Sequence, residues 1–243
     1  MNHPYIIHTA VIATLTALLL PGTLQAESLT ITNPGFETNI VADGAFNVAA
    51  PPTGWSNFGS INQSNRSTGT LNPTGTQLYT GGAREGDNVA VVFLQDGTLG
   101  LEGGIQQILS ATLQPLTQYT LSLQVGNIGN DPNPPHNSFN FTGFPGYRID
   151  LLAGGVVLAS DNNSLAGTIP DREFRLSSLQ FTTGASHPEL DEFLAIRLVN
   201  LDGLNGIEVN FDDVELLAIP VPEPSSALLL ACGSAALLRR RRG

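Results

Sequence analysis

The sequence has very few of the residues that cross-link a fold or attract anions. Among 243 residues there is one cysteine, Cys232, and no lysine. A single thiol cannot form a disulfide within the chain, which excludes a disulfide scaffold. Residues 27–219 carry six arginines against twenty acidic residues. This balance excludes nucleic acid as a partner, because nucleic acid needs a cationic face, and it suits a divalent cation.

Residues that carry common catalytic motifs are also scarce. Between residues 27 and 219 the only histidines are His136 and His187, too few for a typical histidine-based zinc site. There is no Gly-x-Ser-x-Gly elbow and no phosphate-binding glycine loop. The adjacent pair Asp212 and Asp213 would point to opposite faces of a strand, whereas a glycosidase needs two facing carboxyls. The sequence therefore predicts that the protein is not an enzyme, although carboxylates distant in sequence can still meet in space.

The first 26 residues have the order of a secretory signal peptide. Residues 6–20 are almost wholly apolar, Pro21-Gly22 interrupts the run, and Ala26 supplies a small residue for cleavage. We predict cleavage after Ala26 and export of the remainder. The alternative is an uncleaved N-terminal membrane helix.

Residues 220–243 combine three further features. Pro222, Glu223 and Pro224 precede an apolar run at 227–238, and Arg239, Arg240, Arg241 and Arg242 follow it. As a helix the run would be roughly 18 Å long, well short of the roughly 30 Å hydrocarbon core. It is therefore a poor permanent anchor, and the arginines would stay on the cytoplasmic side.

This tail resembles the PEP-CTERM sorting signal of Gram-negative bacteria. The resemblance implies cleavage near residues 222–224 by an exosortase, a membrane protease, in an organism that makes extracellular polysaccharide. The expected location is a transient tether at the inner membrane, then the cell surface or the extracellular matrix of a biofilm. A simple tail anchor is the alternative.

Between the two terminal segments, residues 27–219 are predicted to form one domain of short strands. From Tyr119 to Val125 the large apolar side chains occupy every second position, the period of a half-buried strand. Further strands are expected at 28–32, 88–94, 148–152, 156–159, 175–181, 193–199 and 207–219. Strands at this spacing, with Gly and Pro between them, predict an all-β antiparallel sandwich.

Four short motifs occur in the order found in jelly-roll carbohydrate-binding modules. They are Asn33-Pro-Gly-Phe-Glu37, Gly54-Trp55, Glu85-Gly-Asp-Asn-Val89 and Phe211-Asp-Asp-Val214. The domain thus resembles the galactose-binding-like superfamily, which implies a jelly-roll β-sandwich over 27–219. It also implies a structural Ca²⁺ ion, for which the candidate ligands are Gly35, Glu37, Glu85, Asn88 and Asp212, with Asp87 and Asp213 as alternates.

The residues around the last motif fit an irregular strand near a metal. Calcium binds six to eight oxygen atoms in flexible geometry. The apolar positions are odd from Ile207 to Phe211 and even from Val214 to Leu216, so the side-chain faces exchange across Asp212 and Asp213. A β-bulge or a metal-held kink produces such an exchange. The alternative is that these carboxylates are solvated strand ends.

Aromatic side chains in irregular segments are the candidates for ligand binding. They are Trp55, Phe139, Phe141, Phe144 and Tyr147. Rings on an exposed loop can stack on the apolar face of a sugar. The alternatives are a loop held to the sandwich by its own rings, and a Trp55 that belongs to the core.

The sequence favours an exported structural or adhesive surface protein that associates with exopolysaccharide. Two alternatives remain, a dedicated carbohydrate-binding module and, less favoured, a glycoside-active enzyme.

Overall fold

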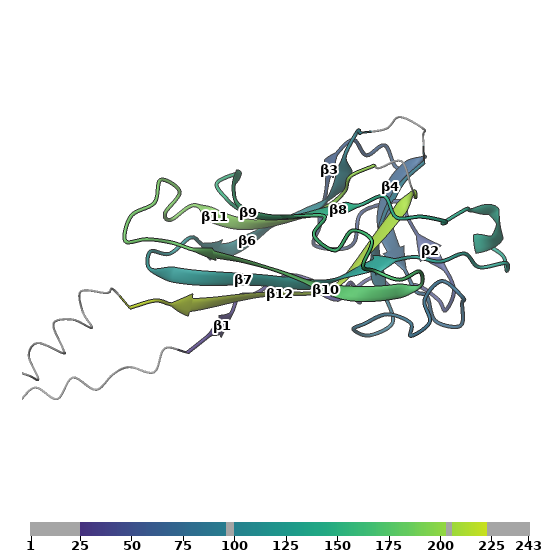
Figure 1. The fold of residues 1–243 in the computed structure, drawn as a ribbon, viewed down its shortest axis with the longest axis horizontal. Helices are drawn as coiled ribbons and strands as arrows, with labels where there is room; N and C mark the ends of the chain where they lie inside the picture. The colour runs from purple at the N-terminus through teal and green to yellow at the C-terminus, as the bar shows by residue number, and fades with distance from the viewer. Residues whose placement is uncertain (1–24, 96–99, 203–205, 223–243) are drawn as a thin grey trace, which may run out of the picture.

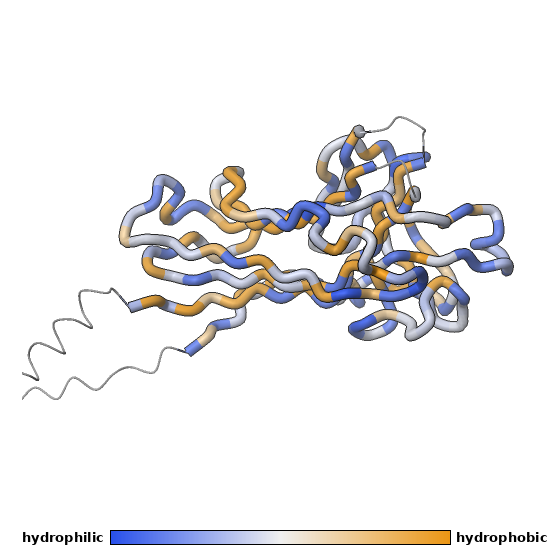
Figure 2. Tube along the Cα trace, viewed as in Figure 1, coloured by the Kyte–Doolittle hydropathy of each residue, from blue (hydrophilic) through white to orange (hydrophobic). Residues whose placement is uncertain are grey.

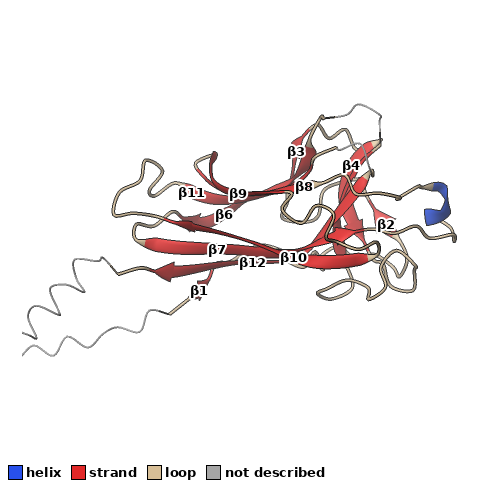
Figure 3. Cartoon of the chain, viewed as in Figure 1, coloured by secondary structure: helices blue, strands red, loops and turns tan. Residues whose placement is uncertain are grey.

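The computed structural model describes residues 25–95, 100–202 and 206–222. In these ranges the chain forms two antiparallel β-sheets that lie face to face (Figure 1). The single helical element described is a 3-10 turn, η1, at His136–Ser138 (Figure 3). The predicted all-β antiparallel sandwich is confirmed.

The first sheet has seven strands and carries the candidate site. They are β1 (Glu27–Ser28), β2 (Phe46–Asn47), β4 (Arg66–Leu71), β5 (Val89–Leu94), β7 (Thr117–Asn127), β10 (Glu173–Thr182) and β12 (Glu208–Pro220). Their order is β10–β7–β12–β5–β4–β2, and β1 pairs with β12 near the end of that strand. The first and last described strands therefore lie side by side (Figure 1).

The second sheet has five strands. They are β3 (Ser56–Gly59), β6 (Gly103–Thr112), β8 (Tyr147–Ala153), β9 (Val156–Asn162) and β11 (Phe193–Asn200). Their order is β3–β6–β11–β8–β9. From β5 to β8 consecutive strands alternate between the two sheets, so the chain repeatedly crosses the core.

The main core lies between the sheets, where apolar segments of both layers face each other (Figure 2). In β7 the buried side chains at every second position from Tyr119 to Val125 all belong to this core. The alternation predicted for this strand is confirmed. Burial of this apolar area is the dominant favourable term in folding, at about 25 cal/mol per Å².

A second apolar cluster lies on the outer face of the seven-stranded sheet. In β5, Ala90 and Val92 face the main core, whereas Val89 and Val91 belong to the outer cluster. Loop residues such as Leu78 and Phe141 cover that outer face. Because both faces of β5 are buried, its sequence is a continuous apolar run rather than an alternating one.

The last strand, β12, changes faces in its middle. Its register against β7 shifts between Asp212 and Glu215, and Asp213 has a φ of +52°. Phe211 and Val214 both face the main core although they are three residues apart. The exchange of faces predicted for this strand is confirmed, and a β-bulge is its cause.

The predicted terminal segments lie largely outside the described residues. These are residues 1–24 of the signal peptide, and residues 223–243, which include the apolar run 227–238 and Cys232. In the described ranges no helix is long and apolar enough to cross a bilayer.

Candidate active site

An apolar pocket lies on the outer face of the seven-stranded sheet, where loops cover β2, β4 and β5. Its lining residues are Phe46, Val48, Ser64, Ser67, Leu71, Val91, Phe93, Ile128, His136, Phe139, Phe141 and Glu208. The cavity measures about 90 Å³. An apolar concave site with a few polar groups is the usual form of a small-molecule pocket.

Phe139 is the centre of an aromatic wall in this pocket. Its ring centroid lies 5.6 Å from those of Phe93 and Phe141 and 6.1 Å from that of Phe46. Aromatic pairs at about 4.5–7 Å attract beyond their buried area. Since Phe93 and Phe46 belong to β5 and β2, these contacts hold the segment around η1 against the sheet and shape the pocket at the same time.

His136 connects two loops at the pocket wall. Its side chain is buried, its Nε2 lies 2.8 Å from the Gly44 carbonyl oxygen, and its ring lies 5.7 Å from that of Phe46. Because a carbonyl only accepts, Nε2 carries the proton and donates to Gly44. His136 thereby ties η1 to the loop that precedes β2.

Glu208 is the single carboxylate in the lining. Its neighbour Val209 faces the main core, so the alternation of β12 turns Glu208 to the outer face and into the pocket. Burial raises the pKa of Glu208 to about 7, although a hydrogen bond from Asn210 acts in the opposite direction. A carboxyl with this pKa is partly protonated near neutral pH and can act as a general acid.

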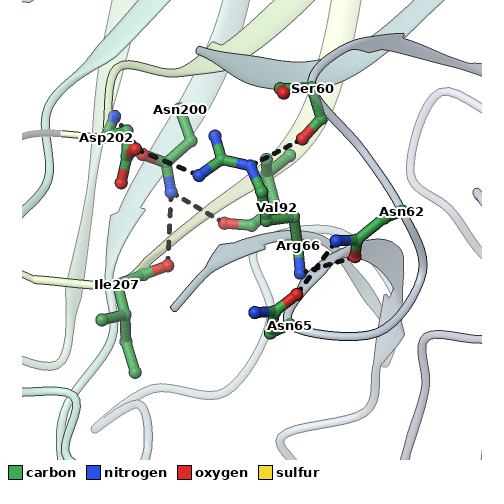
Figure 4. A network of polar contacts seen from close by, with 8 residues as sticks. All are labelled: Ser60, Asn62, Asn65, Arg66, Val92, Asn200, Asp202 and Ile207. Atoms are coloured by element: carbon green, nitrogen blue, oxygen red, sulfur yellow. Dashed lines mark hydrogen bonds and ion pairs between the residues drawn. The ribbon is translucent and has the colours of Figure 1, made fainter. Parts of the chain in front are cut away.

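A buried polar network fixes the start of β12 beside β5 (Figure 4). Asn200 donates through Nδ2 to the carbonyls of Val92, at 3.0 Å, and Ile207, at 3.4 Å. The Arg66 guanidinium forms an ion pair of 3.1 Å with Asp202. Both partners are almost fully buried. The network thus joins β4, β5, the end of β11 and the residue before Glu208.

The aromatic residues predicted as ligand contacts fall into two groups. Phe139 and Phe141 line the pocket. Trp55 packs in the main core, 5.5 Å from Phe36. Tyr147 is fully buried and donates to Asp161 at 2.6 Å, and Phe144 packs beside it with a centroid distance of 6.2 Å.

Four of the residues predicted to bind a metal, Gly35, Glu37, Glu85 and the alternate Asp213, line a second site, which we call the acidic cradle. Its lining residues are Asn33, Pro34, Gly35, Glu37, Thr38, Glu85, Asp213 and Val214. The loop 84–88 is held from two sides. Glu37 Oε1 accepts from the amides of Asp87, at 3.0 Å, and Asn88, at 2.7 Å, while Asp212 Oδ2 accepts from the amides of Arg84, at 2.7 Å, and Glu85, at 3.0 Å.

Negative charge accumulates in the acidic cradle. Burial raises the pKa of Glu85, and the charges of Glu37 and Asp213 raise it further. Burial also raises the pKa of Asp212 to about 7, with three backbone amides opposing the shift and Asp213 adding to it. Carboxylates that raise one another's pKa favour binding of a cation.

Several features of the cradle fit an oxygen-coordinated cation. A Cβ atom at Gly35 would displace the Glu85 carboxylate from its present position, so glycine allows this close approach. The Asn88 Oδ1 atom is buried and accepts no hydrogen bond. However, the described residues contain no group of three or more His, Cys, Asp or Glu side chains close enough to hold a metal ion. Glu37, Glu85 and Asp213 line the cavity, but Glu37 Oε1 and Asp212 Oδ2 accept hydrogen bonds from backbone amides.

The predicted processing sites lie at the edges of the described chain. Ala26 and Pro222 are both exposed. Glu223, Pro224 and Arg239 to Arg242 lie outside the described residues.

The central residue of the pocket was absent from the sequence predictions. Glu208 sits in no motif, and only its acidic side chain at an outward position between apolar neighbours could have drawn attention to it. The pocket forms because loops from three parts of the chain cover one face of the sheet, which no local pattern indicates.

The aromatic pocket with one buried, protonatable carboxyl is typical of an enzyme that acts on a small molecule. A structural surface protein has no need of such a pocket. The model of the HpiC1-like family, described as HpiC1 cyclase, matches residues 27–217. The chain belongs to the HpiC1-like cyclase family.

Solved structures of Stig cyclases resemble this chain. The cyclase Fisc from Fischerella sp. TAU, in complex with (3Z)-3-(1-methyl-2-pyrrolidinylidene)-3H-indole, is 33% identical, covers 82% of this chain and 100% of its own, and has a TM-score of 0.73. A cyclase from the same organism with 4-(1H-indol-3-yl)butan-2-one is 33% identical over 81% of this chain and 100% of its own, with a TM-score of 0.72. No curated protein matches this chain.

These relationships overturn the function predicted from the sequence. The prediction of a non-enzymatic, exosortase-processed structural or adhesive PEP-CTERM protein is wrong, because the folded domain belongs to a cyclase family. The predicted partners, an exosortase and extracellular polysaccharide, are wrong as well, because the related cyclases were solved in complex with small molecules.

The predicted relationship to carbohydrate-binding modules is also wrong. The family model that matches residues 27–217 is that of HpiC1-like cyclases, not of a carbohydrate-binding module. The short motifs behind that resemblance are shared by sandwiches that differ in function, since a fold alone does not fix a function. The alternative of a glycoside-active enzyme is not borne out either, because the matching family is one of cyclases.

Proposed function

We propose that this protein is a cyclase that closes a ring in an indole-containing substrate, with Glu208 as the proton donor. The observation that carries the proposal is the position of Glu208, a buried carboxyl with its pKa raised to about 7, in a pocket lined by four phenylalanines. Family membership supports the reaction class.

The pocket matches a flat, apolar and electron-rich ligand. Phe46, Phe93, Phe139 and Phe141 present ring faces and edges, and the remaining polar lining groups besides Glu208 are His136 and two serines. Indole rings stack favourably against such walls. Two related cyclases were solved with indole ligands, which supports an indole as the substrate core.

The chemistry that Glu208 supplies is acid-initiated ring closure. The proton of Glu208 adds to a π bond of the substrate, and a second π bond of the same molecule attacks the resulting carbocation. One carbon–carbon bond forms and closes the ring. A proton then returns from the cyclised cation to the Glu208 carboxylate, so the reaction is a net isomerisation. The phenylalanine faces stabilise the cation through their quadrupoles.

Binding is tested with 4-(1H-indol-3-yl)butan-2-one by isothermal titration calorimetry. We expect the wild-type protein to bind it and Phe139→Ala to bind about tenfold more weakly, the effect of losing a buried ring contact. Phe193→Ala is the matched control, because Phe193 is an exposed phenylalanine on β11. The absence of binding by the wild-type protein would contradict the indole substrate class.

Turnover is tested with indoles that carry an alkenyl side chain. The expected product has the mass of the substrate, a different retention time and fewer olefinic proton signals. We expect Glu208→Gln to lower kcat by at least about a hundredfold, the range of general acid catalysis. Full activity of Glu208→Gln would refute the role of Glu208.

We also propose that the acidic cradle holds a structural Ca²⁺ ion. Glu37, Glu85 and Asp213 are the carboxylates that line the cavity. Asn88, whose amides donate to Glu37, has a buried Oδ1 atom that accepts no hydrogen bond and is open to a cation. The cation would relieve the repulsion between these groups and tie loop 84–88 to β12. Gly35, Glu37 and Asp212 would shape the site, and Asp87 stays an alternate ligand.

The strand order supports the jelly-roll assignment of the sandwich. The sheets contain the runs β5–β12–β7–β10 and β6–β11–β8–β9. Numbered from β5 as the first of eight strands, these runs are 1-8-3-6 and 2-7-4-5, the arrangement of two joined Greek keys.

We propose, finally, that residues 27–219 act as an exported domain released by cleavage after Ala26, with 220–243 as a separate C-terminal segment. The family match begins at residue 27, which supports this boundary. Location at the cell surface or in the matrix of a Gram-negative bacterium stays a prediction. The N-terminal sequence of the protein recovered from a periplasmic or secreted fraction tests the cleavage.

A further inference from the structure

Behind the pocket, the outer face of β12 carries a second buried polar residue, Asn210. It lies two positions after Glu208, and its side chain is completely buried. A buried amide is costly unless all of its hydrogen-bonding groups are satisfied. The partners of Asn210 therefore show what the site requires of it.

The amide of Asn210 bonds in three directions. Its Nδ2 donates to the Ala90 carbonyl at 3.0 Å and to Glu208 Oε1 at 3.0 Å. Its Oδ1 accepts from the Tyr79 hydroxyl at 2.7 Å. A flipped amide would place Oδ1 against the Ala90 carbonyl, two acceptors facing each other. Ala90 and Tyr79 thus fix the orientation in which the NH₂ group faces Glu208.

Tyr79 is itself held rigidly. Its ring stacks on Phe174 with a centroid distance of 4.3 Å and an interplanar angle of 27°. Burial, with the nearby charges of Glu208, Asp212 and Asp171 adding to it, raises the pKa of Tyr79 well above the usual value. The phenol therefore keeps its proton and remains a donor to Asn210.

This arrangement distinguishes the two oxygens of Glu208. Oε1 accepts a hydrogen bond from Asn210, so a proton on Oε1 would oppose the NH₂ group. Among the described residues, none donates a hydrogen bond to Oε2. We propose that Asn210 and Tyr79 are positioning residues that keep the proton of Glu208 on Oε2, the oxygen available to the substrate; this inference rests on the proposed role of Glu208 as proton donor.

Few other titratable groups face Glu208. His136 lines the same pocket, and Tyr79 donates a hydrogen bond to Asn210. The neighbouring strand β5 has no ionisable residue. On β4, Ser67 lines the pocket, whereas Arg66, on the opposite face of the strand, forms an ion pair with Asp202. The hydrogen bond from Asn210 is therefore the main specific interaction with the Glu208 carboxylate.

The test combines a titration that needs no substrate with steady-state kinetics. In protein labelled with ¹³C at the glutamate carboxyls, the Glu208 signal is assigned by its loss in Glu208→Gln and followed against pH by NMR. Asn210→Leu, close in volume, removes the donor to the ionised carboxylate. We expect it to raise the pKa of Glu208 by about one pH unit and to lower kcat about tenfold with KM within about twofold.

Tyr79→Phe keeps the ring on Phe174 and removes only the hydroxyl that holds Asn210. We expect kcat to fall about threefold to tenfold and the alkaline limb of the pH–rate profile, where Glu208 loses its proton, to shift. Tyr119→Phe is the control, because Tyr119 is a buried tyrosine of the main core whose hydroxyl accepts from the Gln114 amide at 2.8 Å. This control should leave both readouts unchanged.

Each outcome decides the proposal. If Asn210→Leu leaves the pKa of Glu208 and kcat unchanged, the positioning role is refuted. A shifted pKa with unchanged kcat also refutes it. If Asn210→Leu fails to fold, the pKa of Glu208 and the kcat of Tyr79→Phe are measured instead, and unchanged values refute the proposal. If Glu208→Gln is fully active, the proposed function fails, while the titration still shows whether Asn210 holds Oε1.

Discussion

Asn210 in β12 lies directly opposite Gly126 in β7, and the Tyr79 hydroxyl that bonds to Asn210 occupies the space beside that glycine. A Cβ atom at Gly126 would lie 2.5 Å from Tyr79 Oη and 2.5 Å from Phe174 Cε1. Gly126 is also the register partner of Phe174 in β10. The missing side chain on the middle strand is therefore what allows Tyr79 to cross from its loop to Asn210.

Gly126→Ala is expected to displace Tyr79. The added methyl group forces the phenol or Phe174 to move, and overpacking of this kind costs about 1–3 kcal/mol of unfolding free energy. Urea denaturation measures this loss. Gly81→Ala is the control, since a Cβ there meets nothing within 4 Å and the change should be nearly neutral. Equal stability of the two variants would contradict the packing described for Tyr79.

Glu208→Gln is expected to change how stability depends on pH. The pKa of Glu208 is about 7 in the folded protein against an ordinary value of 4.5. The folded state thus binds this proton more tightly than the unfolded chain, so the stability that Glu208 contributes is present below 4.5 and is lost as the pH rises through 7. Glutamine carries no charge at any pH, so the Glu208→Gln variant does not lose stability in this way as the pH rises.

The urea midpoints of both proteins measure this difference. At about pH 8 the glutamine variant should exceed the wild type by about 3 kcal/mol, and at about pH 4 the two should agree, with the difference growing between. A constant difference across this range would show that Glu208 does not have a raised pKa.

Asp202→Asn is expected to weaken the network at the start of β12. Asparagine tolerates the φ of +51° at this position but removes the carboxylate that lies 3.1 Å from Arg66. Breaking a buried ion pair from one side costs about 3 kcal/mol. Glu173→Gln, which breaks an exposed pair with Arg175, should cost less than about 1 kcal/mol. Thermal melts compare the two variants. Equal losses of stability in Asp202→Asn and Glu173→Gln would contradict a structural role for the buried ion pair.

Calcium is expected to raise the melting temperature of the wild-type protein, and a chelator to reverse the rise. Binding to the folded state alone stabilises it by about 2.7 kcal/mol when free calcium is a hundredfold above Kd. Asp213→Asn should remove most of this response. Asp191→Asn is the control, because Asp191 also has a positive φ, +67°, and is exposed outside the cradle. A wild-type melt that does not respond to calcium would exclude the proposed ion.

Parts of the fold followed directly from local patterns. The alternation from Tyr119 to Val125 and the exchange of faces at Asp212 and Asp213 were both predicted and both observed, because side chains alternate along any strand whatever its partners. The convergence of Glu37, Glu85 and Asn88 was also expected, but on a family resemblance rather than on geometry. Which carboxylate of the Asp pair would bind a metal was left open and stays a prediction, although of the two only Asp213 is among the lining residues of the cradle.

The site required information that no local pattern contains. Phe139 and Phe141 drew attention as aromatic residues in a loop, and the structure packs them against Phe93 over the outer face of the sheet. Glu208 is an ordinary surface carboxylate by sequence. Its raised pKa depends on burial by loops more than sixty residues away along the chain, such as the one that carries Phe139.

The sequence by itself determined the class of fold, since period-two patterning and turn residues specify strands, and it determined the acidic, disulfide-free character of the domain. The tertiary structure decided which polar side chains became buried together, and so placed Glu208 in an aromatic pocket with Asn210 and Tyr79 behind it. The physical reason is that the pKa of a carboxyl and the orientation of an amide depend on desolvation and on hydrogen-bond partners, and both are supplied by segments distant in the chain.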